Sequence, residues 1–157
     1  MLYLRHGDDS NLTTPDPKLN LDTLDKTISS IRDLISTYGI PDYIISSPMR
    51  RCRQTAEIIK MIVSHKYGLK VKISIDKRIS RYFNREERKT VIKREIPLDN
   101  YRQFRSRVDR HIRKPSYLIG KNHNIWCITH YLVIKRICRY YDIKIPSNMP
   151  FLWSVKI

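Results

Sequence analysis

The most informative part of this 157-residue chain is the polar segment Ser46-Ser47-Pro48-Met49-Arg50-Arg51-Cys52-Arg53-Gln54-Thr55-Ala56. It follows the apolar run Tyr43–Ile45, which is typical of a buried strand, and it precedes residues with helical periodicity. Pro48 suits the first turn of a helix because it has no backbone N–H to satisfy. The segment therefore predicts a strand-to-helix turn with arginines near a helix N-terminus, where anions are favoured.

Two other polar clusters also follow apolar runs. Arg5-His6-Gly7 comes directly after residues 1–4, and Thr129-His130 comes after residues 124–128. Because the carboxyl ends of parallel strands meet at one edge of a sheet, we expect two imidazoles and two guanidiniums to face each other. No obvious metal-binding carboxylate accompanies them, and guanidinium forks bind phosphate oxygens in pairs. The pattern predicts an anion site that suits a tetrahedral phosphate.

The apolar periodicity predicts alternating strands and helices along the chain. The expected strands are residues 1–4, 42–46, 71–75, 124–128 and 151–157, and the expected helices are residues 19–38, 48–65, 99–113 and 130–141. Such alternation predicts an α/β fold, a three-layer sandwich in which helices flank a mostly parallel central sheet. The sequence has no internal repeat and no Ser/Gly linker, so we expect residues 1–157 to form a single domain.

Composition narrows the class of protein. The chain carries a formal charge of +16, yet 41% of its residues are hydrophobic, which excludes a disordered polycation. No apolar run approaches the roughly 18 residues of a membrane span, and the N-terminus is charged too early for a signal peptide. Cys52, Cys127 and Cys138 lie in apolar stretches and are expected to be reduced. These features predict a cytoplasmic or otherwise intracellular protein, with a location in a particle left open.

The positive charge is concentrated in residues 77–114, which hold 14 Lys and Arg against 5 Asp and Glu. A field of this kind attracts polyanions, so weak and salt-sensitive binding of nucleic acid is one expectation. The alternative is a solvated face balanced by counterions. Aromatic residues interleave with the charges, but one set has helical spacing and is expected to be core rather than a stacking surface. This set is Tyr101, Phe104, Val108 and Ile112.

At the three polar clusters the sequence resembles the histidine phosphatase superfamily, the phosphoglycerate mutase-like fold. The family begins with a strand followed by Arg-His-Gly, as in residues 5–7 here. Its second signature, Ser-Ser-Pro-x-x-Arg-x-x-Gln-Thr-Ala, is matched by residues 46–56, and its third, a strand followed by Thr-His, by residues 129–130. The order and spacing agree along nearly the whole chain. The resemblance implies a phosphorylated substrate and neither a metal nor another cofactor.

The resemblance also implies roles for individual residues. His6 would be the nucleophile that forms a phosphohistidine, and Arg5, Arg51 and His130 would hold the phosphoryl oxygens. Asp9 and Asn11 are further candidates for substrate binding. Residues 77–114 fall where the family builds its substrate cover.

The sequence departs from the family pattern at the proton donor. Arg81 occupies the position where many members have a glutamate, so Glu86, Glu87 or Asp8 are the candidates for that role. In addition, Tyr131 replaces the glycine that usually follows the second histidine. Three functions therefore stay open. The first is phosphomonoester hydrolysis, the second is a non-catalytic descendant that binds phosphate or polyanions in an assembly, and the third is mutase-type phosphotransfer.

Overall fold

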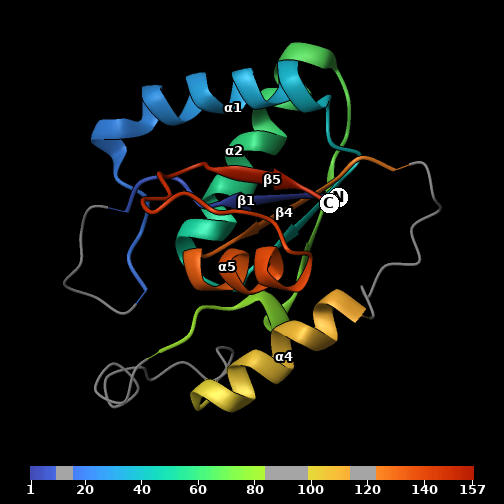
Figure 1. The fold of residues 1–157 in the computed structure, drawn as a ribbon. Helices are drawn as coiled ribbons and strands as arrows, with labels where there is room; N and C mark the ends of the chain where they lie inside the picture. Colours follow the sequence, from blue (N-terminus) through green and yellow to red (C-terminus); the bar gives the residue numbers. More distant parts are fainter. Residues whose placement is uncertain (10–15, 84–98, 114–122) are drawn as a thin grey trace.

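The computed structural model describes residues 1–9, 16–83, 99–113 and 123–157 (Figure 1). Its sheet contains β1 (Leu2–Arg5), β2 (Tyr43–Ser46), β3 (Lys72–Ile75), β4 (Ile125–Thr129) and β5 (Ser154–Lys156). Its helices are α1 (Leu24–Tyr38), α2 (Arg50–Tyr67), α4 (Tyr101–Arg113) and α5 (Tyr131–Tyr140), with 3-10 turns η1 (Leu21–Thr23) and η2 (Lys77–Ile79). These bounds follow the expected elements closely.

The strands form one sheet in the order β3-β2-β4-β1-β5. The first four of these strands are parallel, and β5 runs antiparallel beside β1. In the register of the parallel pairs, Arg5 lies opposite Thr129 and Ser46 lies opposite Ile128. The carboxyl ends of β1, β2 and β4 therefore meet at one edge. The predicted mostly parallel α/β sheet is confirmed.

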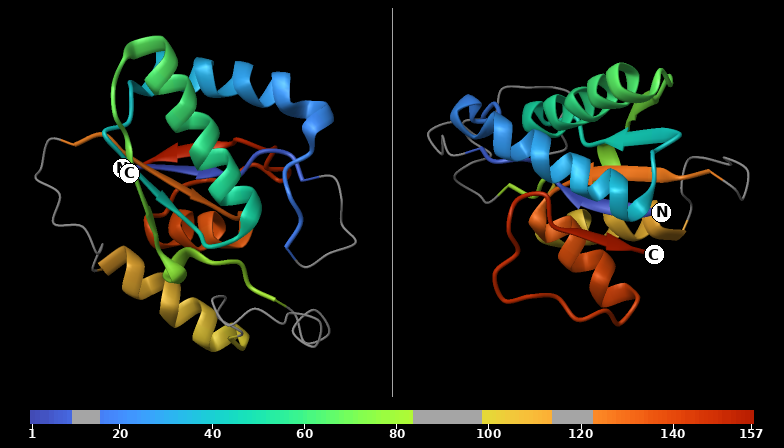
Figure 2. Two further views of the ribbon diagram at one scale, coloured as in Figure 1. Left: turned by 180° about the vertical axis from the view of Figure 1, so that it is seen from behind. Right: turned by 90° about the horizontal axis from the view of Figure 1, so that it is seen from above.

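Helices cover both faces of the sheet and make three layers (Figures 1 and 2). Side chains alternate along each strand, so Leu2 and Leu4 point to the face covered by α1 and α2, while Tyr3 points to the face covered by α4 and α5. Each face has its own apolar core. The two cores contain, for example, Ile31, Ile59 and Trp126 on the first face and Phe104, Val108 and Ile134 on the second.

The predicted helix over residues 19–38 is shorter than expected. Residues 21–23 form the 3-10 turn η1, and the side chain of Leu21 is 74% exposed instead of packing with the helix. The helix ends where predicted, at Gly39, whose φ of 80° is a conformation that favours glycine.

The expectation that Tyr101 belongs to the core is wrong, because its side chain is 49% exposed at the start of α4. The other three residues of that set, Phe104, Val108 and Ile112, are buried as expected. The three cysteines are buried and unpaired. Within the described ranges, none of the helices combines the length and the apolar character that crossing a membrane requires.

Candidate active site

The three polar clusters meet at the carboxyl edge of the sheet. His6 follows β1 and donates its backbone N–H to the carbonyl of Thr129, at 3.1 Å, at the end of β4. Ser47 follows β2 and donates its backbone N–H to the carbonyl of Ile128, at 3.0 Å. These bonds fix the strand ends side by side. His6, Arg51 and His130 are all more than nine-tenths buried there.

The ring of His6 is held in a single tautomer. Its Nδ1 lies 2.7 Å from the carbonyl oxygen of Gly7, which can only accept a hydrogen bond. The proton therefore sits on Nδ1, and Nε2 carries a lone pair. Nε2 in turn accepts a hydrogen bond from Nε of Arg51 at 3.0 Å. Nε2 is therefore the ring nitrogen that can attack an electrophile when a bound ligand draws the Arg51 N–H away from it.

Arg51 links the two histidines. Its Nη2 lies 3.3 Å from Nδ1 of His130, and its Nε donates a hydrogen bond to Nε2 of His6. Because the guanidinium only donates, Nδ1 of His130 is the acceptor and Nε2 of His130 carries the proton, which it donates to Oγ of Ser47 at 2.9 Å. Nη1 of Arg51 is buried and has no hydrogen-bond partner among the described residues. Such a donor is available to an anion in the site.

Other residues of the 46–56 segment hold the loop around His6. Thr55 accepts a hydrogen bond from the backbone N–H of Gly7 at 3.0 Å, and Gln54 accepts one from the backbone N–H of Leu19 at 2.9 Å. Gly7 packs so closely that a β-carbon there would lie 3.2 Å from Leu19 and 3.3 Å from Thr27. These contacts favour glycine at residue 7 and give Gln54 and Thr55 a role in holding the loop.

Arg5 and the C-terminal segment complete one wall. The Arg5 guanidinium donates to the carbonyl of Met149 and lies 4.2 Å from the centre of the Phe151 ring, which is 5.8 Å from the His6 ring. The sequence predicts that Phe151 begins the last strand, but β5 starts at Ser154, and Phe151 precedes it and lies beside His6. No motif marks this residue, because the contact arises only where β5 pairs with β1.

The site keeps its imidazoles neutral. Burial, together with the charge of Arg51, holds the pKa values of His6 and His130 well below their ordinary value. The charge of Arg81 also lowers the pKa values of His6 and His130, so a further positive charge lies near the two rings. Burial raises the pKa of the neighbouring Cys52 thiol to about 12, which leaves it protonated. Neutral imidazoles beside guanidiniums favour an anionic ligand.

Comparison with solved structures gives the same arrangement of elements. The alpha-ribazole phosphatase from Shigella flexneri matches with a TM-score of 0.61 at 17% identity, over 91% of this chain and 80% of its own. The mycobacterial glucosyl-3-phosphoglycerate phosphatase matches with a TM-score of 0.60 at 13% identity, over 98% and 87% of the two chains. The phosphoserine phosphatase from Entamoeba histolytica matches with a TM-score of 0.57 at 18% identity, over 90% and 79%.

The chain has the histidine phosphatase fold. No family model matches its sequence, and a search of curated proteins found no relative. In this fold, His6, Arg51 and His130 are in mutual contact, as expected from the parallel strand ends, and Arg5 lies beside them.

The acidic residues that the sequence offers as proton donors or substrate ligands lie in different places. Oδ2 of Asp9 lies 3.0 Å from Nε of Arg51, the same atom that donates to His6. Asp8 holds the loop through its backbone carbonyl, which accepts from Asn20 at 2.9 Å, and its side chain has no hydrogen bond or ion pair within the described ranges. The candidates Asn11, Glu86 and Glu87 lie outside the described residues.

Proposed function

We propose that the protein hydrolyses phosphomonoesters through a phosphohistidine formed on Nε2 of His6. The observation that carries this proposal is the buried Arg51 guanidinium, which touches both histidines and retains an unpartnered Nη1 within the described part of the chain. A phosphoryl group bound to this guanidinium lies against the lone pair of His6. The neighbours named above are phosphatases, which supports a phosphorylated substrate.

In the first step, the lone pair on Nε2 of His6 attacks phosphorus, and the bond from phosphorus to the ester oxygen breaks. The proton on Nδ1 stays on the ring and keeps its hydrogen bond to the carbonyl of Gly7, which stabilises the positive charge that develops on the ring. Arg51 and Arg5 bind the phosphoryl oxygens and offset their charge in the transition state. His130 accepts a hydrogen bond from Nη2 of Arg51 on its Nδ1 and donates its Nε2 proton to Ser47, so it orients the guanidinium that binds the phosphoryl group.

We assign the proton donor to Asp9. Its carboxylate and Nε2 of His6 share one Arg51 nitrogen at 3.0 Å each, so they lie no more than about 6 Å apart. Burial raises the pKa of Asp9 although Arg51 lowers it. An incoming phosphate dianion competes for Arg51 and repels the carboxylate, which favours protonation of Asp9 further.

The protons then balance through both steps. Protonated Asp9 gives its proton to the leaving alkoxide in the first step. In the second step a water molecule attacks the phosphohistidine, Asp9 takes the proton of that water, and the N–P bond breaks. The electron pair returns to Nε2 of His6, and inorganic phosphate leaves the site.

The test is the trapping of the covalent intermediate with an aryl phosphate as substrate. The wild type is expected to give acid-labile, base-stable protein-bound phosphate, and His6→Ala is expected to give none and to lose turnover. His65→Ala, at an exposed histidine near the end of α2, is the matched control and keeps both. A wild type that binds phosphate but forms no adduct would instead favour the non-catalytic descendant.

A further inference from the structure

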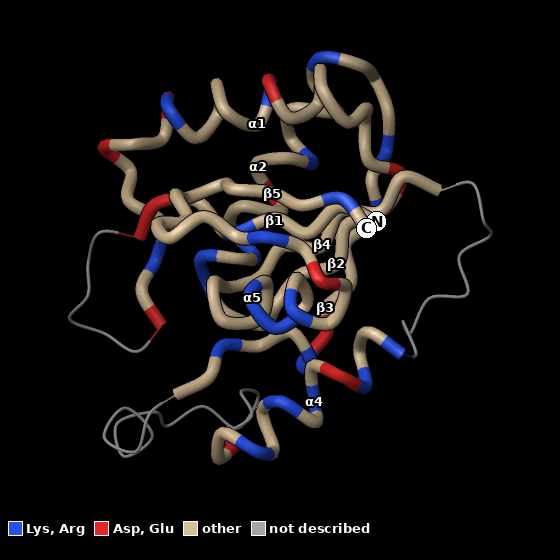
Figure 3. Tube along the Cα trace, in the orientation of Figure 1, with Lys and Arg blue, Asp and Glu red and all other residues tan. Residues whose placement is uncertain are grey.

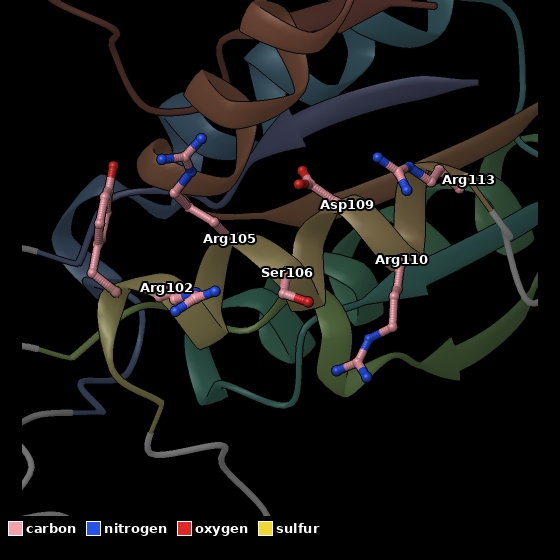
Figure 4. A pocket seen from close by; sticks show the side chains of 7 residues that line it. Arg102, Arg105, Ser106, Asp109, Arg110 and Arg113 are labelled. Atoms are coloured by element: carbon pink, nitrogen blue, oxygen red, sulfur yellow. The ribbon is translucent and has the colours of Figure 1, made fainter.

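Lys and Arg recur along α4 (Figure 3), and four exposed arginines of this helix lie in two parallel rows (Figure 4). Residues four apart lie on one side of a helix, and the rows are Arg102, Ser106, Arg110 and Arg105, Asp109, Arg113. Each row has an arginine at both ends and a small polar or acidic residue between them. The rows border a groove of about 500 Å³. Tyr101, the first residue of α4, also lines this groove. All four arginines are exposed.

The charge of this groove is not balanced within the described residues. Its carboxylate, Asp109, accepts two hydrogen bonds of 2.7 Å from Arg136 of α5, and these bonds lower the pKa of Asp109. Asp109 is therefore ionised and already paired. The four groove arginines have no side-chain hydrogen bond or ion pair within the ranges that the structure describes.

A fifth arginine of α4 shows the contrast. Arg107 points inward, is 5% exposed, pairs with Asp99, and donates to the backbone carbonyls of residues 77, 78 and 80. It holds α4 to the η2 segment, and the buried side of the helix packs through Phe104 and Val108. The fold therefore uses Arg107, whereas the four outward arginines make no such contact with the part of the chain that the structure describes.

The spacing fits a repeating anion. The two arginines of a row are eight residues apart, which is about 12 Å along a helix. A single phosphate cannot reach both, but a nucleic-acid strand carries one phosphate per nucleotide, so successive phosphates of the same strand can contact both arginines. The planar guanidinium of arginine donates two hydrogen bonds to the oxygens of one phosphate, whereas the ammonium of lysine acts as a point charge. The half-exposed Tyr101 ring, stacked on Phe104, adds a surface for an unpaired base.

We propose that the outward face of α4 binds the sugar-phosphate backbone of single-stranded nucleic acid, without sequence preference and separately from the His6 site. Two kinds of arginine can therefore be distinguished among the described residues of the basic segment 77–114. Arg78 and Arg107 are structural, because Arg78 pairs with Asp76 at 3.0 Å and Arg107 with Asp99. The four groove arginines form the binding surface.

The test measures the affinity of a labelled oligothymidylate by fluorescence anisotropy across a salt series. Replacing Arg102, Arg105, Arg110 and Arg113 with Gln should reduce the log-log salt slope by about 3, since each lost phosphate contact contributes about 0.7. The matched control replaces four exposed lysines on the other side of the molecule with Gln and loses the same charge. These lysines are Lys26, Lys60, Lys66 and Lys70. The control should keep most of the slope, and the thermal midpoint verifies that both variants are folded.

Three outcomes would overturn the proposal. The first is an equal loss of slope in the control, which indicates a diffuse field. The second is equal binding of polyglutamate, which indicates charge without phosphate recognition. The third is displacement of the oligonucleotide by vanadate, which places it in the His6 site. Tyr101→Ala should weaken binding by about fivefold or more, and Tyr101→Phe should restore it, because the ring alone is needed for stacking.

Discussion

Replacing Asp9 with Asn tests the proposed mechanism most directly, because it is expected to weaken catalysis and strengthen phosphate binding together. Asp9 lies 3.0 Å from Nε of Arg51 with a side chain that is 13% exposed. The amide keeps the size of the carboxyl group but can neither donate an acidic proton nor carry a negative charge. A residue that only supports the loop would not give opposite effects on the two quantities.

The magnitudes follow from these two losses. Removing a general acid typically lowers the rate by about 10²- to 10⁴-fold. This loss should be seen in kcat for an alkyl phosphate, whose alkoxide leaves slowly without a proton. A hydrogen bond to a charged group contributes about 1.5–3 kcal/mol, so freeing Arg51 from Asp9 should tighten inhibition by inorganic phosphate by about 10- to 100-fold.

The assay compares glycerol phosphate with p-nitrophenyl phosphate, whose leaving group needs no proton. The readout is the rate of phosphohistidine formation in a single turnover, because Asp9 also takes part in hydrolysis of the adduct of either substrate. The Asp9→Asn variant should keep most of this rate on the aryl ester and lose it on the alkyl ester, and Asp8→Asn should resemble the wild type on both. Equal losses on the two substrates would refute the acid role of Asp9. A selective loss in Asp8→Asn instead would transfer that role to Asp8.

Two further predictions concern Arg51 and the buried histidines. Arg51→Ala should weaken vanadate binding by at least about tenfold, whereas Arg53→Ala, at an exposed position of the same helix, should leave it nearly unchanged in a titration. The urea midpoint should fall as the pH drops below about 6.5, because the unfolded chain takes up protons on the His6 and His130 rings, while the folded chain, with both pKa values lowered, does not. His130→Gln should reduce this pH dependence in the same titration, and an unchanged slope would contradict it.

Much of the fold and the centre of the site could be predicted from local patterns. The periodicity of residues 124–128 identifies a strand that is buried on both faces, and Arg5-His6-Gly7 and Thr129-His130 each follow such a strand. Parallel pairing then brings His6 and His130 together, because strand ends in register share an edge. Helical register also selects Arg51, which is 3% exposed, from its exposed neighbours Arg50 and Arg53.

The proposed proton donor and the wall of the site could not be predicted in this way. Asp8 and Asp9 are adjacent and chemically alike, and only the path of the loop directs one carboxylate onto Arg51. Phe151 reaches His6 because β5 turns back beside β1, a pairing between the two ends of the chain that leaves no local signature.

The sequence by itself determined the order of strands and helices and the identity of the histidines and Arg51, since these depend on side-chain periodicity and on residue type at strand ends. The tertiary structure alone decided which nitrogen of His6 carries the lone pair, which carboxylate touches Arg51, and which arginines of α4 face outward. The physical reason is that tautomer, ion pairing and exposure depend on distances between residues far apart in the chain. Hydrogen bonds and charges act over a few ångströms, and only folding sets those distances.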